Sequence, residues 1–318
     1  MTLAELLHKR LILLSGKGGV GKTTVAVLLA LVAARQKKKA LIVEMNSTER
    51  VAPFFGLKSI GHREIPLAPY ITGINLNPRD CFEEYVLMQI RFKTLFNAFF
   101  NNRFVTYFLN AVPGLNELLM IGKIFYLEKQ KDKRTAEPLY DLIIVDGPAT
   151  GHGVSAFEVP RIARDAIKVG PLRTQSDRIL SLLTNVSKTA FSVVTLAEEM
   201  PVVEAEELIA TVRKKLDLPL GPIFINAVCQ TDITKGEFDA LIDKMPEKDD
   251  PLYPYFAYAS LSCQRARLNA EYREMLMEKN KSLECMTIPF QYEEITSTKS
   301  LEPMVNEFCQ MGKWGDLR

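Results

Sequence analysis

The chain has 318 residues, of which 47% are hydrophobic and 25% are charged, and its formal net charge is +2. This composition is typical of a globular protein with a large buried core, and the length allows one large α/β domain or two small ones. The nearly balanced charge argues against nucleic acid as a partner.

The five cysteines are widely spaced and include no Cys-x-x-Cys pair, the pattern of reduced thiols in a cytoplasmic protein. Residues 1–10 mix apolar and polar side chains directly before the first predicted strand, which leaves no room for a signal peptide. No uncharged apolar run approaches the roughly 20 residues that a membrane helix needs. We therefore expect a cytoplasmic location without a transmembrane segment, which leaves a peripheral role at a membrane open.

Apolar runs of β type recur along the chain and alternate with helical patterns, which predicts an α/β fold with a doubly wound, mainly parallel sheet. The predicted strands cover residues 11–14, 40–45, 142–145, 192–196, 223–228 and 286–289. A sheet of this kind binds its ligand outside the carboxyl ends of the strands. We expect residues 1–318 to form a single domain, with a helical insertion at residues 80–130.

The first predicted strand leads into a glycine-rich loop with two lysines. The loop reads Ser15-Gly16-Lys17-Gly18-Gly19-Val20-Gly21-Lys22-Thr23-Thr24. Its glycines let backbone N–H groups wrap a triphosphate, and the helix that follows adds its dipole. Lys22 is expected to reach the β and γ phosphates, and Thr23 is expected to ligate Mg²⁺. The sequence thus predicts a phosphate-binding loop for a nucleoside triphosphate with Mg²⁺.

A second nucleotide motif follows the predicted strand 142–145. Asp146 ends this apolar run, and such an acid commonly holds Mg²⁺ through a water molecule. Gly147 leaves a backbone N–H free for the γ phosphate. Four apolar residues and an aspartate alone are weak evidence for such a motif. The segment continues, however, as Pro148-Ala149-Thr150-Gly151-His152.

These motifs resemble those of one large ATPase family with a deviant Walker A signature. Lys17, directly after the first glycine, is similar to the signature lysine of the partitioning and division-site ATPases, the nitrogenase iron protein, the arsenite-pump ATPase and the tail-anchored-protein targeting ATPase. Asp146 to His152 resembles, in slightly shifted form, the switch II pattern Asp-x-x-Pro-Thr-Gly-His of the last two. Residues 168–171 and 197–201 resemble segments of bacterial anion-transporting ATPases, which we take as the closest group.

The resemblance implies a P-loop ATPase fold and a homodimer that holds ATP between its subunits. Lys17 would then reach the partner's nucleotide, whereas the alternative is a solvated loop lysine. Asn226 occupies the position of an asparagine that contacts adenine. Pro289 and Phe290 resemble the loop that packs against the base. His152 is either part of switch II or a surface loop residue.

Switch I departs from the family pattern. Asn46 falls where the family carries an aspartate that activates the attacking water, and an amide does not accept a proton at neutral pH. Glu44, two residues earlier, points to the same side of an extended strand. It either substitutes for that aspartate or anchors the switch loop. We expect slow hydrolysis of ATP rather than none.

A second departure concerns zinc. Ser260-Leu261-Ser262-Cys263, before a helix expected to begin near Gln264, resembles the Cys-x-x-Cys zinc site of the eukaryotic targeting ATPase with its first cysteine replaced. Two thiolates in a dimer are too few for a closed tetrahedral site. We therefore predict no structural zinc. No trio of cysteines suggests an arsenite site.

The insertion at residues 80–130 is apolar at helical spacing, which more often indicates core or dimer packing than a binding surface. In the targeting ATPases the helices at this position build a groove for a client's membrane helix. The segment between switch II and residue 192 is short and predicts one amphipathic helix near 176–183. This makes tail-anchored clients doubtful and favours another protein client. A C-terminal helix at 301–308 is expected to pack onto the sheet.

Together these features predict an ATP-binding and slowly hydrolysing homodimeric switch ATPase whose nucleotide state controls a helical partner-binding surface. One alternative is an ATP-sensing chaperone or scaffold dimer with negligible hydrolysis, which Asn46 supports. A second is a partitioning-type ATPase on DNA, against which the near-neutral charge and the apolar insertion count.

Overall fold

An eight-stranded sheet forms the centre of the computed structural model, which describes residues 1–45, 48–89, 112–149 and 153–312. The strand order is β3-β4-β2-β5-β1-β6-β7-β8, and every pair is parallel except the antiparallel edge pair β3–β4. The strands are β1 (Leu11–Gly16), β2 (Ala40–Glu44), β3 (Ile65–Ala68), β4 (Ile71–Asn75), β5 (Leu142–Ala149), β6 (Thr189–Leu196), β7 (Leu220–Val228) and β8 (Cys285–Pro289). The predicted doubly wound, mainly parallel α/β fold is confirmed.

All six predicted strands are present, but β3 and β4 were not predicted. β3 lies at the sheet edge, its residues are half-buried or exposed, and Pro66 interrupts the apolar pattern. The hairpin turns at Tyr70, which has a φ of 65°. A short edge hairpin of this kind lacks the continuous apolar run that identifies a central parallel strand.

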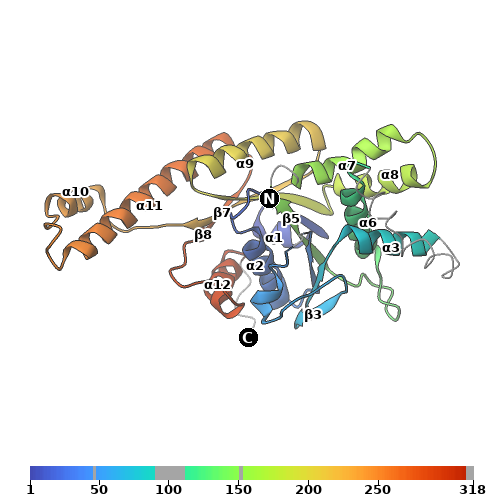
Figure 1. The fold of residues 1–318 in the computed structure, drawn as a ribbon, viewed down its shortest axis with the longest axis horizontal. Helices are drawn as coiled ribbons and strands as arrows, with labels where there is room; N and C mark the ends of the chain where they lie inside the picture. Colours follow the sequence, from blue (N-terminus) through green and yellow to red (C-terminus); the bar gives the residue numbers. More distant parts are fainter. Residues whose placement is uncertain (46–47, 90–111, 150–152, 313–318) are drawn as a thin grey trace.

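Helices cover both faces of the sheet (Figure 1). Their bounds are α1 (Leu3–Leu7), α2 (Lys22–Arg35), α3 (Pro78–Gln89), α6 (Leu115–Lys129), α7 (Gly153–Ala166), α8 (Pro171–Leu183), α9 (Glu199–Thr211), α10 (Lys235–Asp243), α11 (Tyr253–Lys279) and α12 (Glu302–Met311), with single turns at η1 (Ala52–Phe55), η2 (Val212–Leu216) and η3 (Lys299–Leu301). Helices α6, α7, α8, α9 and α11 bury side chains on one face, and α1, α2 and α12 bury theirs on the other.

Three predicted helices have other bounds than expected. The segment after switch II forms two helices, α7 and α8, rather than one near 176–183. Helix α11 begins at Tyr253, well before Gln264, and Pro254 lies in its first turn, where a missing N–H costs nothing. The insertion at 80–130 supplies α3 and α6, while residues 90–111 lie outside the described residues.

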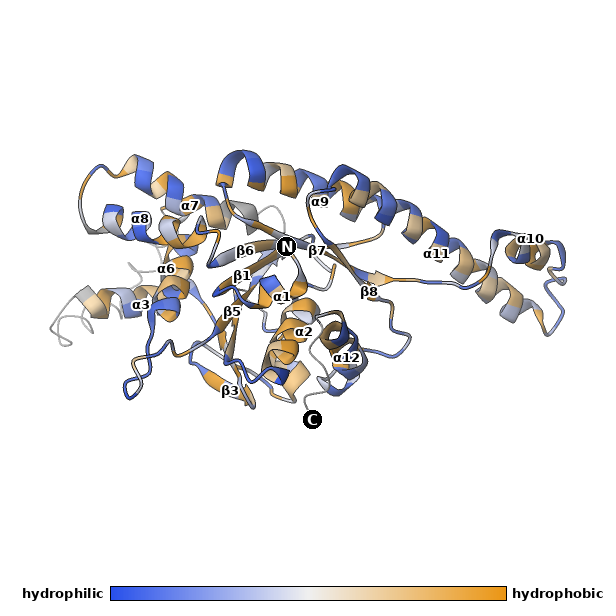
Figure 2. Ribbon diagram, turned by 180° about the vertical axis from the view of Figure 1, so that it is seen from behind, coloured by the Kyte–Doolittle hydropathy of each residue, from blue (hydrophilic) through white to orange (hydrophobic). Residues whose placement is uncertain are grey.

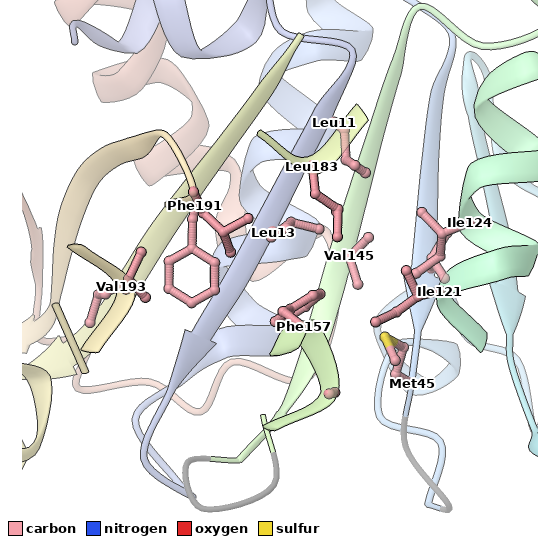
Figure 3. Packing of buried hydrophobic residues seen from close by; sticks show 14 of the residues in the cluster. Leu11, Leu13, Met45, Ile121, Ile124, Val145, Phe157, Leu183, Phe191 and Val193 are labelled. Atoms are coloured by element: carbon pink, nitrogen blue, oxygen red, sulfur yellow. The ribbon is translucent and has the colours of Figure 1, made fainter. Parts of the chain in front are cut away.

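Successive residues of each central strand alternate between two separate cores. In β1, Leu11 and Leu13 face the α6–α7–α8 side, whereas Ile12 and Leu14 face α2. Figure 3 shows Leu11 and Leu13 beside Val145, Phe157 and Phe191, with Ile121 and Ile124 of α6 close to Met45. The two cores hold the carboxyl ends of the strands at one edge.

Helix α2 is apolar on most sides because it is covered twice. Its buried side chains run from Val25 to Ala33 between the sheet and α12. Figure 2 shows its strongly hydrophobic colouring. Helix α12 buries Met304, Val305 and Phe308 in the same core and packs chiefly against α2, whereas the C-terminal helix was predicted to pack onto the sheet.

Helices α3, α6 and α8 lie at one end of the molecule (Figure 1). Helix α10 lies at the other end of the molecule, beside the long helix α11. Within the described residues, no helix combines the length and the apolar character that a membrane crossing requires.

Candidate functional site

The glycine-rich loop leaves β1 at Gly16 and enters α2 at Lys22. Gly21 is the N-cap of α2 with a φ of 91°, and no side chain caps the helix. A Cβ on Gly21 would lie 2.1 Å from Nδ2 of Asn226, so only glycine fits this turn. Gly18 and Gly19 are exposed, whereas Val20 is buried. The uncapped N-terminus of α2 therefore presents free N–H groups beside an open glycine loop, the arrangement that binds anions.

Lys22 bends back over this loop. Its Nζ donates hydrogen bonds to the carbonyl oxygens of Gly16, at 3.0 Å, and of Lys17, at 2.9 Å. Burial lowers the pKa of Lys22, the Asp146 carboxylate opposes this shift, and the Arg50 charge adds to it. Phosphate oxygens are stronger acceptors than neutral carbonyls, so the lysine would form stronger hydrogen bonds with a phosphate than with its present carbonyl partners.

Thr23 and Asp146 lie together between α2 and β5. The Thr23 hydroxyl donates to Asp146 Oδ2 at 2.6 Å. Asp146 is 1% exposed, and its Oδ1 has no hydrogen-bond partner among the described residues. Burial raises the pKa of Asp146 to about 6, although the Thr23 hydrogen bond and the charges of Lys22 and Arg50 oppose the shift.

This donor set fits Mg²⁺. A buried carboxylate oxygen that lacks a partner, next to a hydroxyl, matches the hard oxygen ligands that the ion prefers. Gly147, the next residue of β5, lies against β1, and a Cβ there would come within 2.4 Å of the Leu14 carbonyl oxygen. A larger residue at this position would push β5 away from the loop.

Glu44 ends β2 directly beside Asp146, its register partner on β5. The carboxylate is completely buried and accepts the backbone N–H of Arg50 at 2.5 Å and that of Val51 at 3.5 Å. Burial raises the pKa of Glu44 to about 7, the Arg50 N–H lowers it, and the neighbouring Asp146 raises it further. These contacts are those of a loop anchor. Asn46 lies outside the described residues.

Lys17 is held by its own chain. Its Nζ lies 2.7 Å from Oε1 of Glu204 on α9, with the two side chains 37% and 28% exposed. An ion pair that is this open to solvent is weak and exchanges its partners readily. Lys17 is therefore available to another anion at small cost.

The predicted base-contacting residues lie at the ends of β7 and β8. Asn226 Nδ2 donates to the Val20 carbonyl at 3.0 Å, which ties β7 to the phosphate loop. Pro289 ends β8, and the Phe290 N–H donates to the Val228 carbonyl at 3.0 Å. The Arg265 guanidinium stacks 5.0 Å from the Phe290 ring centroid. Thr24 is half-buried in the first turn of α2, one residue beyond Thr23.

Three residues that the sequence did not single out belong to this edge. Arg50 affects the pKa of both Lys22 and Asp146, and Glu204 pairs with Lys17. The Glu49 carboxylate accepts N–H groups of Ile60, at 2.6 Å, and Gly61, at 2.8 Å, which fixes the loop after β2. Only the position of Arg50 and Glu49 shortly after Glu44 could have suggested them, and nothing in the sequence signals Glu204.

Two further predicted features are only partly described. His152 lies outside the described residues. Cys263 is buried, with Sγ 3.7 Å from the Thr231 hydroxyl. Across the described part of the chain, no three His, Cys, Asp or Glu side chains gather closely enough to hold a metal ion. The prediction that the protein has no structural zinc stays a prediction.

Comparisons with known proteins agree with this geometry. A family model described as "Anion-transporting ATPase" matches residues 9–175. The "ATPase BagA" of Mycobacterium tuberculosis is 33% identical over 222 residues, which are 68% of this chain and 64% of that protein. The match thus spans slightly less than two thirds of the mycobacterial protein.

Two eukaryotic proteins are also similar. An "ATPase ASNA1 homolog" of Entamoeba dispar is 23% identical over 255 residues, covering 68% of this chain and 76% of that protein. The "ATPase get3" of Schizosaccharomyces japonicus is 26% identical over 196 residues, covering 58% of this chain and 57% of that protein. Both similarities are weaker in identity than the mycobacterial one.

Proposed function

The chain belongs to the anion-transporting ATPase family, and from this premise we propose that it is an ATP-binding, slowly hydrolysing homodimeric switch. Its nucleotide state controls a helical surface that binds a protein client. The observation that carries the proposal is the 2.6 Å contact between Thr23 and Asp146, beside Lys22 at the open end of α2. We take residues 1–318 as one ATPase domain with a helical insertion at 80–130.

The phosphate loop, Gly16 to Thr24, binds the triphosphate through its backbone N–H groups. Lys22 exchanges two carbonyl partners for the β and γ phosphate oxygens, whose negative charge offsets the lowering of its pKa by burial. Thr23 and Asp146 would hold Mg²⁺, which would neutralise negative charge on the triphosphate. Asn226, Pro289 and Phe290 border the base.

Hydrolysis forms a bond from a water oxygen to the γ phosphorus and breaks the bond to the β–γ bridging oxygen, so that ADP leaves. The water must lose a proton, and an amide such as Asn46 cannot take it. Glu44 is committed to the N–H groups of Arg50 and Val51. Without a dedicated base, the proton passes to a γ-phosphate oxygen of the substrate. Catalysis then relies on positioning and on the positive charge of Lys22 and of the partner's lysine, so turnover is slow.

The dimer closes through an exchange at Lys17. In the single chain this lysine pairs with Glu204. In the ATP-bound dimer it leaves Glu204 and pairs with the partner's nucleotide, which links dimerisation to the nucleotide state. We place this switch in the cytoplasm, without structural zinc, with no nucleic acid as partner and with a peripheral membrane role left open.

One other function has specific support. The family aspartate is replaced by Asn46, and Glu44 has the contacts of an anchor, which favours an ATP-sensing chaperone or scaffold dimer with negligible hydrolysis. Both functions share the same binding site and the same dimer. They differ only in whether phosphate is released.

Two assays on the full chain separate these outcomes. Calorimetry with ATP and Mg²⁺ measures binding, and a phosphate-release assay measures turnover, each with wild type and Lys22→Ala. We expect binding and slow release, both lost in the variant. Binding without release would select the sensor function. Absence of ATP binding to the wild type would refute both.

A further inference from the structure

A cavity of about 500 Å³ lies between α3, α6 and α8. These helices lie at the end of the molecule opposite α10 (Figure 1). Its walls are largely apolar and include Leu118, Leu119, Phe125 and Ile179. Cys81 also lines it, and burial raises the pKa of this thiol to about 12, so the thiol is a neutral part of the wall. The volume falls within the roughly 300–1,000 Å³ of small-molecule sites.

Two charged groups that line this cavity pair with each other, since Lys123 Nζ lies 2.6 Å from Glu84 Oε2. His62 Nε2 adds to this pair at 3.5 Å from Glu84 Oε1. The Ser176 hydroxyl is buried and has no hydrogen-bond partner among the described residues. An apolar chamber with one unused hydroxyl suits a ligand that is mainly hydrocarbon.

A second hollow, of about 430 Å³, adjoins the first and shares Phe125, Lys129 and Arg178 with it. Its lining adds Lys188, so the described residues that line it include three cations and no acid. The single carboxylate of Glu128 lies behind it and pairs with Lys129 and Lys188, each at 3.2 Å. No ion pair of Arg178 occurs within the described part of the structure. The hollow therefore carries surplus positive charge at the border of the apolar cavity.

From this juxtaposition we propose that the cavity binds a single-chain amphiphile with an anionic head group, of the fatty-acid class. The hydrocarbon chain lies between α3, α6 and α8, and the carboxylate lies at Arg178 and Lys129. Each buried methylene contributes about 0.8 kcal/mol, and charge-assisted hydrogen bonds hold the head group. This site is separate from the nucleotide site, and the inference does not depend on ATP binding.

Size argues against an apolar protein helix as the occupant. A membrane-spanning helix of about 20 residues is roughly 30 Å long and 10 Å across, which corresponds to roughly 2,400 Å³. The cavity offers about 500 Å³. A fatty acid with about twelve carbons suits a site of this size class, which is small for a complete membrane-spanning helix.

Gly122 of α6 offers a direct way to fill the cavity. It lines the cavity, and a Cβ added there meets no atom within 4 Å. Gly122→Leu therefore occupies the chamber and also raises the helix propensity of α6. Gly236→Leu in α10, where a Cβ likewise meets nothing within 4 Å, is the matched control far from the site.

The test is calorimetric titration of the full chain with dodecanoate below its micelle concentration, and with dodecanol as a neutral probe. We expect saturable binding of dodecanoate to the wild type and to Gly236→Leu. Gly122→Leu should weaken it at least tenfold without any loss of thermal stability. Arg178→Gln, which leaves the chamber intact, should weaken dodecanoate about three- to tenfold and leave dodecanol unaffected.

Several results would overturn the inference. One is the absence of saturable binding to the wild type, as when another part of the chain fills the cavity. Another is equal affinity of wild type and Gly122→Leu. Binding of dodecanol as tight as that of dodecanoate would remove the anionic head group from the proposal. Displacement of dodecanoate by a 20-residue apolar helical peptide would assign the surface to a polypeptide instead.

Discussion

The phosphate-loop edge of the sheet and the helical end at α3, α6 and α8 differ in the kind of group that lacks a partner. The edge has buried polar groups with incomplete hydrogen bonding, and the helical end has uncovered apolar walls. At the edge, Asp146 is buried with an oxygen that lacks a partner among the described residues. Burial also raises the pKa of Glu44 and lowers the pKa of Lys22, and both shifts favour the neutral form of the side chain. At the helical end, Glu84 is paired with Lys123, and apolar walls remain open instead.

The difference indicates two different ligands. Buried polar groups without full partners reduce stability unless a ligand supplies the missing contacts, so the edge fits a charged, metal-bound polyphosphate. Open apolar walls reduce stability unless hydrocarbon covers them, so the helical end fits an apolar chain. The following predictions test the edge half of this comparison, from the largest expected effect to the smallest.

Lys22→Ala should have the largest effect. It removes the cation expected on the β and γ phosphates, and each charged hydrogen bond that is lost costs about 1.5–3 kcal/mol, so ATP affinity should fall roughly 100-fold. Calorimetry with ATP and Mg²⁺ measures this change. Lys58→Ala, on the exposed surface, is the control. An unchanged affinity would remove Lys22 from the site.

Asp146→Asn should weaken ATP binding and stabilise the free protein at the same time. An amide still accepts the Thr23 hydrogen bond but is a poorer ligand for Mg²⁺, so Mg²⁺-dependent affinity should fall roughly tenfold. Since burial raises the pKa of Asp146 to about 6, its ionised form destabilises the fold at pH 8. Each kcal/mol recovered should raise the melting temperature by about 2–4 °C. A lower melting temperature would refute the idea that the buried, ionised Asp146 carboxylate destabilises the protein without ligand.

Glu44 should make stability depend on pH. Its pKa is raised from 4.5 to about 7, so the folded protein binds a proton more tightly than the unfolded chain. The free energy of unfolding should therefore fall between about pH 4.5 and 7, by about 1–2 kcal/mol relative to Glu44→Gln. Urea denaturation at several pH values measures this. Glu293→Gln, at an exposed site, should follow the wild type. Parallel curves for wild type and Glu44→Gln would contradict the shift.

Glu204→Gln should have the smallest effect. It releases Lys17 from a partly exposed ion pair worth about 0.2–1 kcal/mol, so ATP-dependent dimerisation should strengthen by at most about fivefold for each of the two protomers. Sedimentation at several protein concentrations measures the change. Glu207→Gln, exposed on the same helix, should leave dimerisation as it is. Weaker dimerisation of Glu204→Gln would mean that Glu204 supports the dimer rather than competing with it.

The sequence predicted the central sheet well because its strands are continuous apolar runs buried on both faces. It missed β3, a half-exposed edge strand with Pro66, and β4, a short strand whose apolar residues are separated by Thr72 and Gly73. It also gave one helix where α7 and α8 form, because the first of them begins directly after switch II.

The site divides in the same way. Lys22, Thr23 and Asp146 follow from local motifs whose spacing fixes their geometry. The pairing of Lys17 with Glu204 joins residues 187 positions apart, which only the tertiary fold brings together. Glu44 could be identified as important but not assigned a role, because the choice between base and anchor depends on which N–H groups face its carboxylate.

The most direct test of the switch is sedimentation velocity of the wild type and Lys17→Ala, each with ADP or with ATP and Mg²⁺. The wild type should be mainly monomeric with ADP and shift to a dimer with ATP. Lys17→Ala should still bind ATP in calorimetry but stay monomeric. A wild type whose sedimentation is the same with both nucleotides, or a Lys17→Ala variant that dimerises as readily, would contradict an ATP-gated dimer.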